Sequence, residues 1–298
     1  MDISVVIPTY NRKKILEITL PNILNQDFEG EYEIIVSDDG SEDETSSYIK
    51  ELQGKYKNLK YIKNNERKGP AYARNRAIEI AKGKLMVFID SDIFVKKDFL
   101  KNHFEIQKKN NFNILVQGPV INTYNWEKPW EEKFKLRDIS SAYFATGNAS
   151  IPKEILLKAG FFDENFTFYG WEDLELGIRI KKLNIPKITS EKVTVWHIQT
   201  PPNLKNLPYL LNKEKERAKS ALYFYKKHPI LEVKMMIQLG KIYEIGNFIQ
   251  RLFGLINEKN IDKWWEWAEK RGYHTLSQIF LSGVLNKVYL EELKRISS

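Results

Sequence analysis

The sequence predicts an α/β fold with a mainly parallel central sheet, followed by a helical C-terminal extension. Short β-rich runs alternate with amphipathic helical patterns from residue 3 to about 120, which is typical of such a sheet. After about residue 204 only helical periodicity remains. Because a chain of 298 residues is long enough for one sizeable domain and a smaller unit, we expect two units, residues 1–204 and 205–298.

The elements are expected in the following order. Apolar, β-branched runs predict strands at 3–8, 33–37, 59–62, 85–89, 114–121 and 192–196. Apolar residues at helical spacing predict helices at 13–25, 42–52, 70–81, 97–108, 152–159 and 172–183. The change of character follows Pro201 and Pro202, after which helices are expected at 213–227, 231–253, 261–270 and 276–296.

Composition excludes several classes of protein. A hydrophobic content of 42% with 29% charged residues is that of a folded globular protein and argues against disorder. The chain has no cysteine, which excludes disulfides and thiolate metal sites and is compatible with the cytoplasm. The net charge of +8 suits an anionic partner. However, the lysines are scattered and no nucleic-acid-binding motif is present, so we expect no nucleic-acid partner.

Two acidic motifs each follow an expected strand. Asp38 and Asp39 precede Gly40 after the strand at 33–37, where carboxylates can bind the ribose hydroxyls or the base of a nucleotide; the alternative is a solvated turn that caps the next helix. Asp90 and Asp92 flank Ser91 after the strand at 85–89. They can supply oxygen ligands to Mg²⁺ or Mn²⁺, unless they are only a polar strand end.

The helix expected at 70–81 opens with small residues and carries Arg74 and Arg76. Small residues allow a helix to approach its neighbours closely, and an arginine near the first turn can face phosphate groups. One of the two arginines can equally be a solvent-exposed residue. The pattern therefore predicts one phosphate-binding arginine here.

The last two candidate motifs lie in the second half of the first unit. Glu172 and Asp173 open a helix directly after Gly170 and Trp171; a helix N-terminus favours carboxylates in any case, but an aromatic residue beside a carboxylate is also a common way to hold a sugar. His197 ends the last expected strand. A lone histidine is more often structural, and its place beside the other motifs is what makes it a candidate.

These features, in this order, resemble the inverting family-2 glycosyltransferases of the GT-A fold. Residues 5–12, Val-Val-Ile-Pro-Thr-Tyr-Asn-Arg, are similar to the first strand and loop of that family. The stretches 146–148 and 170–173 resemble the β1,4-galactosyltransferase and chondroitin-polymerase type, although that type usually has tryptophan before glycine rather than after it. The resemblance covers residues 1 to about 200 and says nothing about the C-terminal helices.

The resemblance implies a role for each matching residue. The nucleotide would be held by Pro8, Thr9, Tyr10, Arg12, Asp38, Asp39, Arg74, Asp90 and Ser91. Asp92 and His197 would bind the metal, Asp173 would be the catalytic base, and Gly147, Asn148, Trp171 and Glu172 would contact the sugars. We expect Asp173 to be ionised at neutral pH, because a helix N-terminus favours the charged carboxylate.

The expected activity is the transfer, with inversion, of a sugar from a nucleotide sugar to a hydroxyl of a glycan or lipid-linked glycan acceptor. UDP is the expected nucleotide and Mn²⁺ or Mg²⁺ the expected metal. A sugar nucleotidyltransferase is one alternative, but it needs a glycine-rich phosphate loop where this chain has Pro8-Thr9-Tyr10-Asn11. A non-catalytic sugar-binding protein is another, and the presence of Asp92, Asp173 and His197 together argues against it.

The C-terminal helices are rich in apolar side chains, among them Trp264, Trp265, Trp267, Phe248 and Phe253. Packing against one another is the simpler interpretation. A peripheral membrane or partner surface is the alternative, because tryptophan beside lysine suits the headgroup region of a bilayer.

Overall fold

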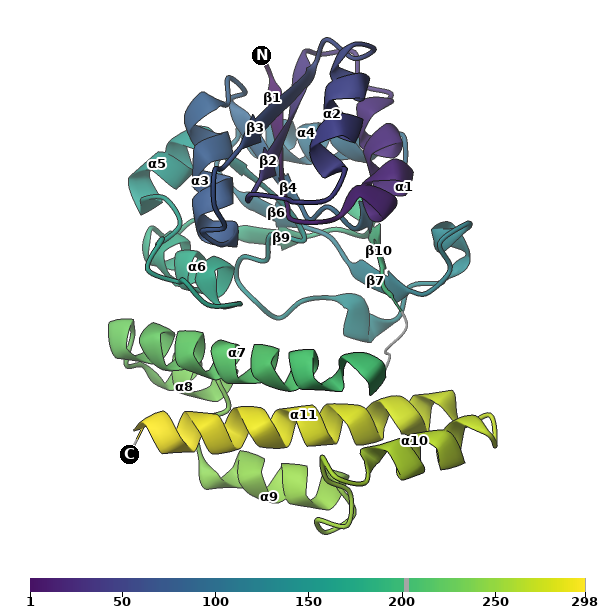
Figure 1. The fold of residues 1–298 in the computed structure, drawn as a ribbon. Helices are drawn as coiled ribbons and strands as arrows, with labels where there is room; N and C mark the ends of the chain where they lie inside the picture. Colours follow the sequence, from purple (N-terminus) through teal and green to yellow (C-terminus); the bar gives the residue numbers. More distant parts are fainter. Residues whose placement is uncertain (201–203, 298) are drawn as a thin grey trace. The chain divides into compact units, whose positions relative to one another are not determined.

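The computed structural model describes residues 1–200 and 204–297 (Figure 1). The chain forms two compact units. The sheet unit consists of Met1–Asn165 and Glu172–Thr200, and the helical unit consists of Phe166–Trp171 and the described residues 204–297. The sequence did not indicate that the short segment 166–171 belongs with the helices. Pro201 and Pro202, where the change of character was predicted, lie outside the described residues.

A seven-stranded sheet forms the centre of the sheet unit, in the order β3-β2-β1-β4-β8-β6-β9. All its strands are parallel except β8, which runs antiparallel to β4 and β6, so the mainly parallel sheet is confirmed. The strands are β1 (Ile3–Thr9), β2 (Tyr32–Asp38), β3 (Leu59–Lys63), β4 (Leu85–Ile89), β6 (Leu115–Gln117), β8 (Asn148–Pro152) and β9 (Lys187–Thr189).

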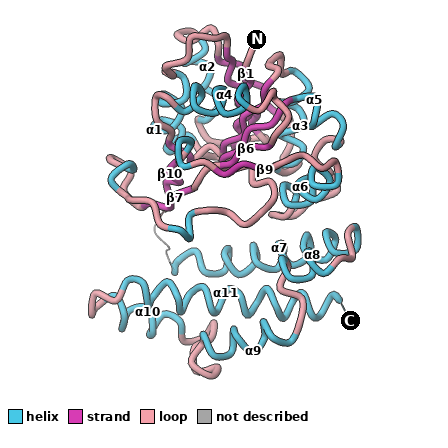
Figure 2. Tube along the Cα trace, turned by 180° about the vertical axis from the view of Figure 1, so that it is seen from behind, coloured by secondary structure: helices cyan, strands magenta, loops and turns pink. Residues whose placement is uncertain are grey.

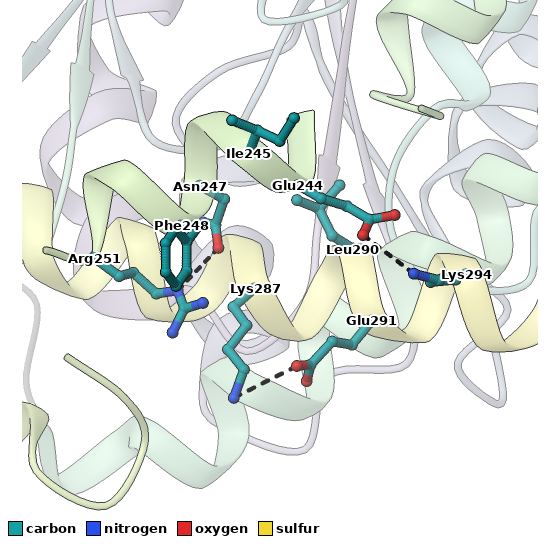
Figure 3. A pocket seen from close by; sticks show the side chains of 9 residues that line it. All are labelled: Glu244, Ile245, Asn247, Phe248, Arg251, Lys287, Leu290, Glu291 and Lys294. Atoms are coloured by element: carbon teal, nitrogen blue, oxygen red, sulfur yellow. Dashed lines mark hydrogen bonds and ion pairs between the residues drawn. The ribbon is translucent and has the colours of Figure 1, made fainter. Parts of the chain in front are cut away.

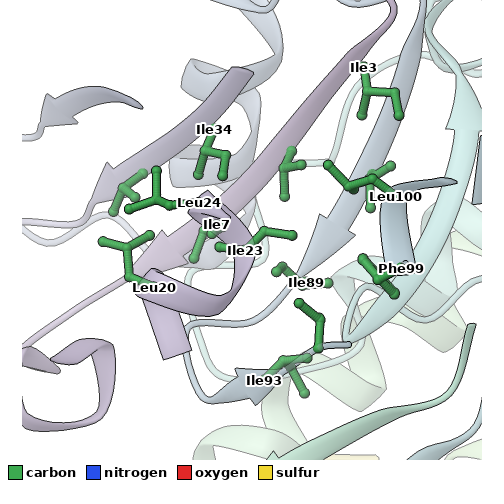
Figure 4. Close-up of a cluster of buried hydrophobic side chains, with 14 of the residues drawn as sticks. Ile3, Ile7, Leu20, Ile23, Leu24, Ile34, Ile89, Ile93, Phe99 and Leu100 are labelled. Carbon is green, nitrogen blue, oxygen red and sulfur yellow. The ribbon is translucent and has the colours of Figure 1, made fainter. Parts of the chain in front are cut away.

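Helices cover both faces of this sheet (Figures 1 and 2). Side chains of a strand alternate between its faces, so Ile3, Val5 and Ile7 of β1 join one buried cluster while Val6 joins the other. Figure 4 shows part of the first cluster, with Leu20 and Phe99 packed against the strands. The helices of its face are α1 (Lys13–Leu24), α2 (Thr45–Gln53) and α4 (Phe99–Lys109), and those of the opposite face are α3 (Pro70–Ile80), α5 (Lys153–Ala159) and α6 (Glu172–Lys182).

A second, three-stranded sheet has the order β5-β10-β7, formed by β5 (Ile93–Phe94), β10 (Val195–Ile198) and β7 (Val120–Thr123). The single strand predicted at 114–121 is therefore wrong. It is divided at Gly118-Pro119 into β6 and β7, which belong to different sheets, because proline has no N–H to continue a ladder. The strand predicted at 192–196 begins only at Val195, after a 3₁₀ turn at Glu191–Val193. Further 3₁₀ turns lie at Pro129–Glu131, Leu136–Asp138 and Leu204–Asn206.

The helical unit contains α7 (Leu207–Lys227), α8 (Leu231–Met236), α9 (Lys241–Gln250), α10 (Ile261–Glu269) and α11 (His274–Ser297). The long helix α11 contacts α7, α9 and α10. Trp264 and Trp265 pack against the buried cluster around Ile261 and Phe280, so the packing interpretation holds for these two tryptophans. The helix predicted at 231–253 is interrupted where Gln238 takes a left-handed conformation, with φ 57°. Among the described residues, no helix is long and apolar enough to cross a bilayer.

Candidate active site

The loops that follow β1, β2 and β4 leave the sheet at one edge, because these three strands are parallel neighbours. Thr9 pairs with Asp38 in the register of β1 and β2, and the N–H of Asp39 donates to the carbonyl of Thr9 at 2.9 Å. Ligands of open α/β sheets bind at this carboxyl edge. The structure therefore brings the loop after β1, the motif at Asp38 and Asp39 and the motif at Asp90 and Asp92 to the same edge of the sheet.

The carboxylates of Asp38 and Asp39 are buried and bonded within the chain. Asp38 accepts hydrogen bonds from the backbone N–H of Ser41 at 2.8 Å and from the hydroxyl of Tyr61 at 2.5 Å. Asp39 accepts from Asn64 at 3.0 Å and from the backbone N–H groups of Lys68 and Gly69 at 2.9 and 2.7 Å. Both aspartates therefore shape the loops around the edge. Neither aspartate caps the next helix, because the N-cap residue of α2 is Glu44. The nucleotide contacts expected of both aspartates stay predictions.

The loop after β1 offers two further groups. The hydroxyl of Thr9 is buried without a hydrogen-bond partner, so it is available to a ligand. The guanidinium of Arg67 lies over the ring of Tyr10, 4.6 Å from its centroid, and sequence reasoning missed this arginine. Pro8 pairs with Ser37 in the sheet and is partly buried, and the nucleotide contact expected of it stays a prediction.

Asp92 and His197 lie side by side although they are far apart in the sequence. The Oδ2 atom of Asp92 is 3.3 Å from Nε2 of His197 and 3.1 Å from Nη1 of Arg12. Strand pairing explains the contact: β5 begins directly after Asp92, and in its antiparallel pairing with β10 the partner of Ile93 is His197. The pairing of β5 with β10 thus places His197 beside Asp92, in the arrangement that the resemblance implied.

The ring of His197 is oriented by Asn122, a residue that no motif in the sequence selects. In the parallel pairing of β10 with β7, His197 lies opposite Asn122, and its Nδ1 is 2.9 Å from Oδ1 of that asparagine. Because Oδ1 only accepts, Nδ1 must donate. This leaves Nε2 facing the Asp92 carboxylate.

The pKa values of this pair reflect the contact. Burial alone would raise the pKa of Asp92, but the hydrogen bond and charge of His197, together with Arg12, lower it below its ordinary value. Burial alone would lower the pKa of His197, but Asp92 raises it above its ordinary value. A protonated His197 can therefore donate from Nε2 to the Asp92 carboxylate, 3.3 Å away.

The pair therefore fits a divalent metal. A ligating histidine usually donates its other N–H to a carbonyl oxygen, as His197 does to Asn122. No group of three or more His, Cys, Asp or Glu able to hold a metal occurs in the described part of the chain. The remaining ligands would therefore be other oxygens, which Mg²⁺ and its relatives commonly take from water and phosphate.

Arg74 connects the acidic motif to the start of α6. Its Nη2 is 2.9 Å from Oδ1 of Asp90, and its Nη1 is 2.8 Å from Oε1 of Glu172. Burial would lower the pKa of Arg74, but the charges of Asp90 and Glu172 raise it, so the guanidinium stays charged. The Nε of Arg74 and the Oε2 of Glu172 are buried without partners and remain available to a ligand.

Other residues of these motifs make contacts within the chain, and the nucleotide contact expected of Ser91 stays a prediction. Arg76 is exposed and pairs with Glu79 at 2.7 Å, so it is the solvent-facing arginine of the two. The backbone carbonyl of Ser91 accepts from the hydroxyl of Thr19 at 2.7 Å, which ties the acidic motif to α1. Arg179 and Glu175 form an ion pair within α6, at 2.7 Å.

Asp173 is half-buried at the start of α6. Its Oδ1 accepts from the N–H of Leu174 at 2.8 Å, and its Oδ2 lies 3.4 Å from the N–H of Thr146. Burial and the neighbouring charge of Glu172 raise its pKa to about 7, against the lowering effect of Arg74. The expectation that Asp173 is fully ionised at neutral pH is therefore wrong, because burial outweighs the helix N-terminus.

The two residues expected to contact sugar from the stretch 146–148 are placed differently. Gly147 lies at the site: a Cβ on it would be 3.6 Å from Oδ2 of Asp90. Asn148 is buried, and its Nδ2 donates to the carbonyl of Val193 at 2.6 Å while its Oδ1 is 3.2 Å from Nε2 of His103. Asn148 is thus a support for β8, and a sugar contact for it stays a prediction.

Trp171 belongs to the helical unit. Its Nε1 donates to the carbonyl of Arg217 on α7 at 3.0 Å, and its ring lies 6.3 Å from that of Phe224. Its φ of 77° is left-handed, a strained conformation for a non-glycine residue that persists only when its surroundings hold it. In this structure the tryptophan anchors segment 166–171 on α7, and the sugar contact expected of it stays a prediction.

The fold and the residues at this edge define a GT-A glycosyltransferase. The chain belongs to glycosyl transferase family 2, whose profile matches residues 4–166. It is 25% identical to the uncharacterized glycosyltransferase YfnE of Bacillus subtilis, over 89% of this chain and 86% of that protein. It is 29% identical to the chondroitin synthase of Escherichia coli over 68% of this chain, but that match spans only 35% of the synthase.

Solved structures agree on the fold. The mannosyltransferase PcManGT from Pyrobaculum calidifontis, in complex with GDP-Man and Mn²⁺, has a TM-score of 0.63 at 19% identity, covering 97% of this chain and 86% of that one. S. aureus TarS 1-349, in complex with UDP-GlcNAc, has a TM-score of 0.58 at 18% identity, covering 100% and 92%. Glycosyltransferases with bound nucleotide sugars thus share this architecture.

Proposed function

We propose that this glycosyltransferase moves a sugar from a UDP-sugar to a hydroxyl of a glycan or lipid-linked glycan, with inversion at the anomeric carbon and with a divalent metal. One observation carries the proposal. Arg74 bonds both Asp90 and Glu172, which connects the acidic motif to the start of α6, where Asp173 has a raised pKa. Arg74 thus links Glu172, the neighbour of the proposed base, to Asp90, which lies two positions before the proposed metal ligand Asp92, and this proximity suits a displacement at a diphosphate-linked sugar.

Asp173 is the proposed base. In a single displacement the acceptor oxygen forms a bond to the anomeric carbon, the bond from that carbon to the diphosphate oxygen breaks, and the acceptor proton passes to a carboxylate oxygen of Asp173. A pKa of about 7 suits this step, because the best general base has a pKa near the operating pH. Direct displacement inverts the configuration.

Asp92 and His197 are the proposed metal ligands, with Mn²⁺ and Mg²⁺ as the candidate ions. When bound, such an ion neutralises the charge of a departing diphosphate. Asn122 holds the His197 ring with Nε2 toward Asp92, and Arg12 adds a second positive charge beside the same carboxylate. The free hydroxyl of Thr9 and the Tyr10–Arg67 stack support a nucleotide position along the same edge.

Thermal shifts with a panel of nucleotides test the donor, since a ligand that binds only the folded state raises its stability. We expect UDP with Mn²⁺ to raise the Tm more than GDP with Mn²⁺, and UDP with a chelator to raise it little. An equal shift with GDP would reject UDP as the nucleotide. An equal shift with chelator would reject the metal role of Asp92 and His197.

A further inference from the structure

The helix α9 packs with its polar side inward and its apolar side outward. Asn247 donates to the carbonyl of Gly283 at 2.8 Å and Gln250 to the hydroxyl of Ser282 at 2.9 Å, both on α11. Arg251, just after the helix, is also buried and donates to Asn247 at 3.0 Å. The polar side chains at 247, 250 and 251 therefore form the seam with α11, which is the reverse of an ordinary surface helix.

The apolar side of α9 is exposed and continues into the turn that follows. Positions 242, 245, 249 and 253 recur at helical spacing, and the exposed fraction reaches 74% at Ile242 and 70% at Phe253. We call this surface the α9 strip: Ile242, Ile245, Phe248, Ile249, Phe253 and Leu255. Single exposed apolar residues are common, but a contiguous set on one helix face marks a binding surface.

Basic and acidic side chains together border the strip. A groove of about 410 Å³ lies between α9 and α11. Figure 3 shows Ile245 and Phe248 of α9 and Lys287 and Lys294 of α11, which line it. Within α9 itself the one acidic residue, Glu244, is paired with Lys294 at 3.2 Å. Lys287 is likewise paired, with Glu258 at 3.2 Å and with Glu291 at 3.5 Å, so the charge that favours an anionic partner is the net charge of the whole unit.

The charge of the chain is concentrated in the same unit. Residues 201–298 hold 17 lysines and arginines against 10 acidic residues, a net charge of +7 out of +8 for the whole chain. A second copy of this unit would bring a like charge to the strip, which opposes self-association. An anionic bilayer has the complementary charge and can also bury apolar side chains.

We propose that the α9 strip is a peripheral membrane-docking surface that inserts its apolar side chains into the interface of a bilayer containing anionic lipid. An amphipathic helix of this kind lies in the plane of the interface, with its apolar side toward the acyl chains. The polar seam with α11 then keeps the helix on the protein. The helical unit thereby holds the enzyme at a membrane surface.

Vesicle co-sedimentation of the full chain tests this proposal. We expect binding to vesicles of phosphatidylcholine with phosphatidylglycerol at low salt, and weaker binding at high salt, because salt screens the attraction. The double variant Ile242→Gln/Ile249→Gln should bind at least about tenfold more weakly, since it removes apolar surface that the bilayer would bury. Both side chains are exposed, so circular dichroism should show an intact fold.

The matched control is Leu157→Gln/Leu183→Gln, which changes two exposed apolar residues of the sheet unit. This control should bind vesicles as the wild type does. The proposal is overturned if the wild type does not bind anionic vesicles at low salt, or if both double variants weaken binding equally. It is also overturned if sedimentation velocity shows a dimer that the Ile242→Gln/Ile249→Gln variant abolishes while vesicle binding is unchanged.

Discussion

Nη1 of Arg74 lies 2.8 Å from Oε1 of Glu172, although 98 positions separate these residues in the sequence. Both side chains are buried, and Arg74 also holds Asp90. One guanidinium therefore fixes the first turn of α6 relative to the end of β4. Removing one partner of a buried ion pair leaves an uncompensated charge, so this contact should matter for stability as well as for catalysis.

We expect Arg74→Gln to lower the free energy of unfolding by about 3–5 kcal/mol, the range for breaking a buried ion pair. Urea unfolding followed by circular dichroism measures this change. The control is Arg76→Gln, because Arg76 is exposed and pairs only at the surface; its effect should stay within about 0.5 kcal/mol. Equal effects of the two substitutions would mean that the Arg74 pair contributes nothing beyond a surface contact.

We expect Asp173→Asn to lower kcat by about 10² to 10⁴, the usual contribution of a positioned base, with little change in UDP-sugar affinity. In the wild type, kcat should rise as the pH passes about 7, because the base must be ionised to accept the proton. Sugar-transfer assays at a series of pH values measure the pH dependence of kcat. NMR of the product gives its anomeric configuration. Near-wild-type turnover of the variant, or a retained configuration, would remove Asp173 from the proposed role.

The same substitution should stabilise the protein at neutral pH. The pKa of Asp173 is about 7 in the folded protein against an ordinary value of 3.8, so the folded state binds the proton more tightly than the unfolded state. The cost of this buried carboxyl to stability therefore grows as pH rises from about 4 to about 7. Thermal unfolding should show Asp173→Asn above the wild type in Tm at pH 8, with the difference shrinking toward pH 4.

We expect Asn122→Ala to weaken Mn²⁺ binding in the presence of UDP by about 10- to 100-fold, because groups that orient a metal-binding histidine contribute that much. Titration calorimetry measures the affinity. Asn125→Ala is a suitable control, since Asn125 lies in the loop after β7 and its side chain bonds Lys128 rather than the site. An unchanged affinity for Asn122→Ala would show that the orientation of His197 does not depend on this contact.

Trp171→Phe distinguishes an anchor on α7 from a sugar contact. The substitution keeps an aromatic ring but removes the hydrogen bond to Arg217, so an anchor predicts a loss of about 1 kcal/mol in unfolding free energy and an unchanged KM. A sugar contact predicts the opposite, a raised KM at unchanged stability. Trp267→Phe serves as the control, because that ring is partly exposed on α10.

Local patterns predicted the first half of the fold well. The strand predicted at 85–89 has the bounds of β4, and the helix predicted at 70–81 differs from α3 by one residue. Both succeed because a continuous apolar run and a proline after glycine are signals contained within the element itself. The motifs at Asp38 and Asp90 could be located for the same reason, since each lies at or directly after the end of such a strand, whereas Thr9 was selected only by the family resemblance.

Features set by long-range pairing could not be predicted in this way. The division of 114–121 depends on β6 and β7 finding partners in different sheets, and the role of Asn122 depends on the register of β10 with β7. The raised pKa of Asp173 depends on burial, which the dipole of its own helix does not reveal. Likewise, the inward polar side of α9 is set by α11 rather than by its own pattern.

Segment 166–171 has a consequence for how the chain is made. Phe166 is buried against Tyr223, with ring centroids 4.9 Å apart, and Trp171 bonds to Arg217. Both partners lie on α7, which is synthesised after the segment that it buries. During translation at roughly 5–20 residues per second, these aromatic side chains leave the ribosome seconds before α7 does. For that interval the nascent chain exposes aromatic surface that a chaperone would bind. A protein truncated before α7 would expose the same surface permanently and would aggregate.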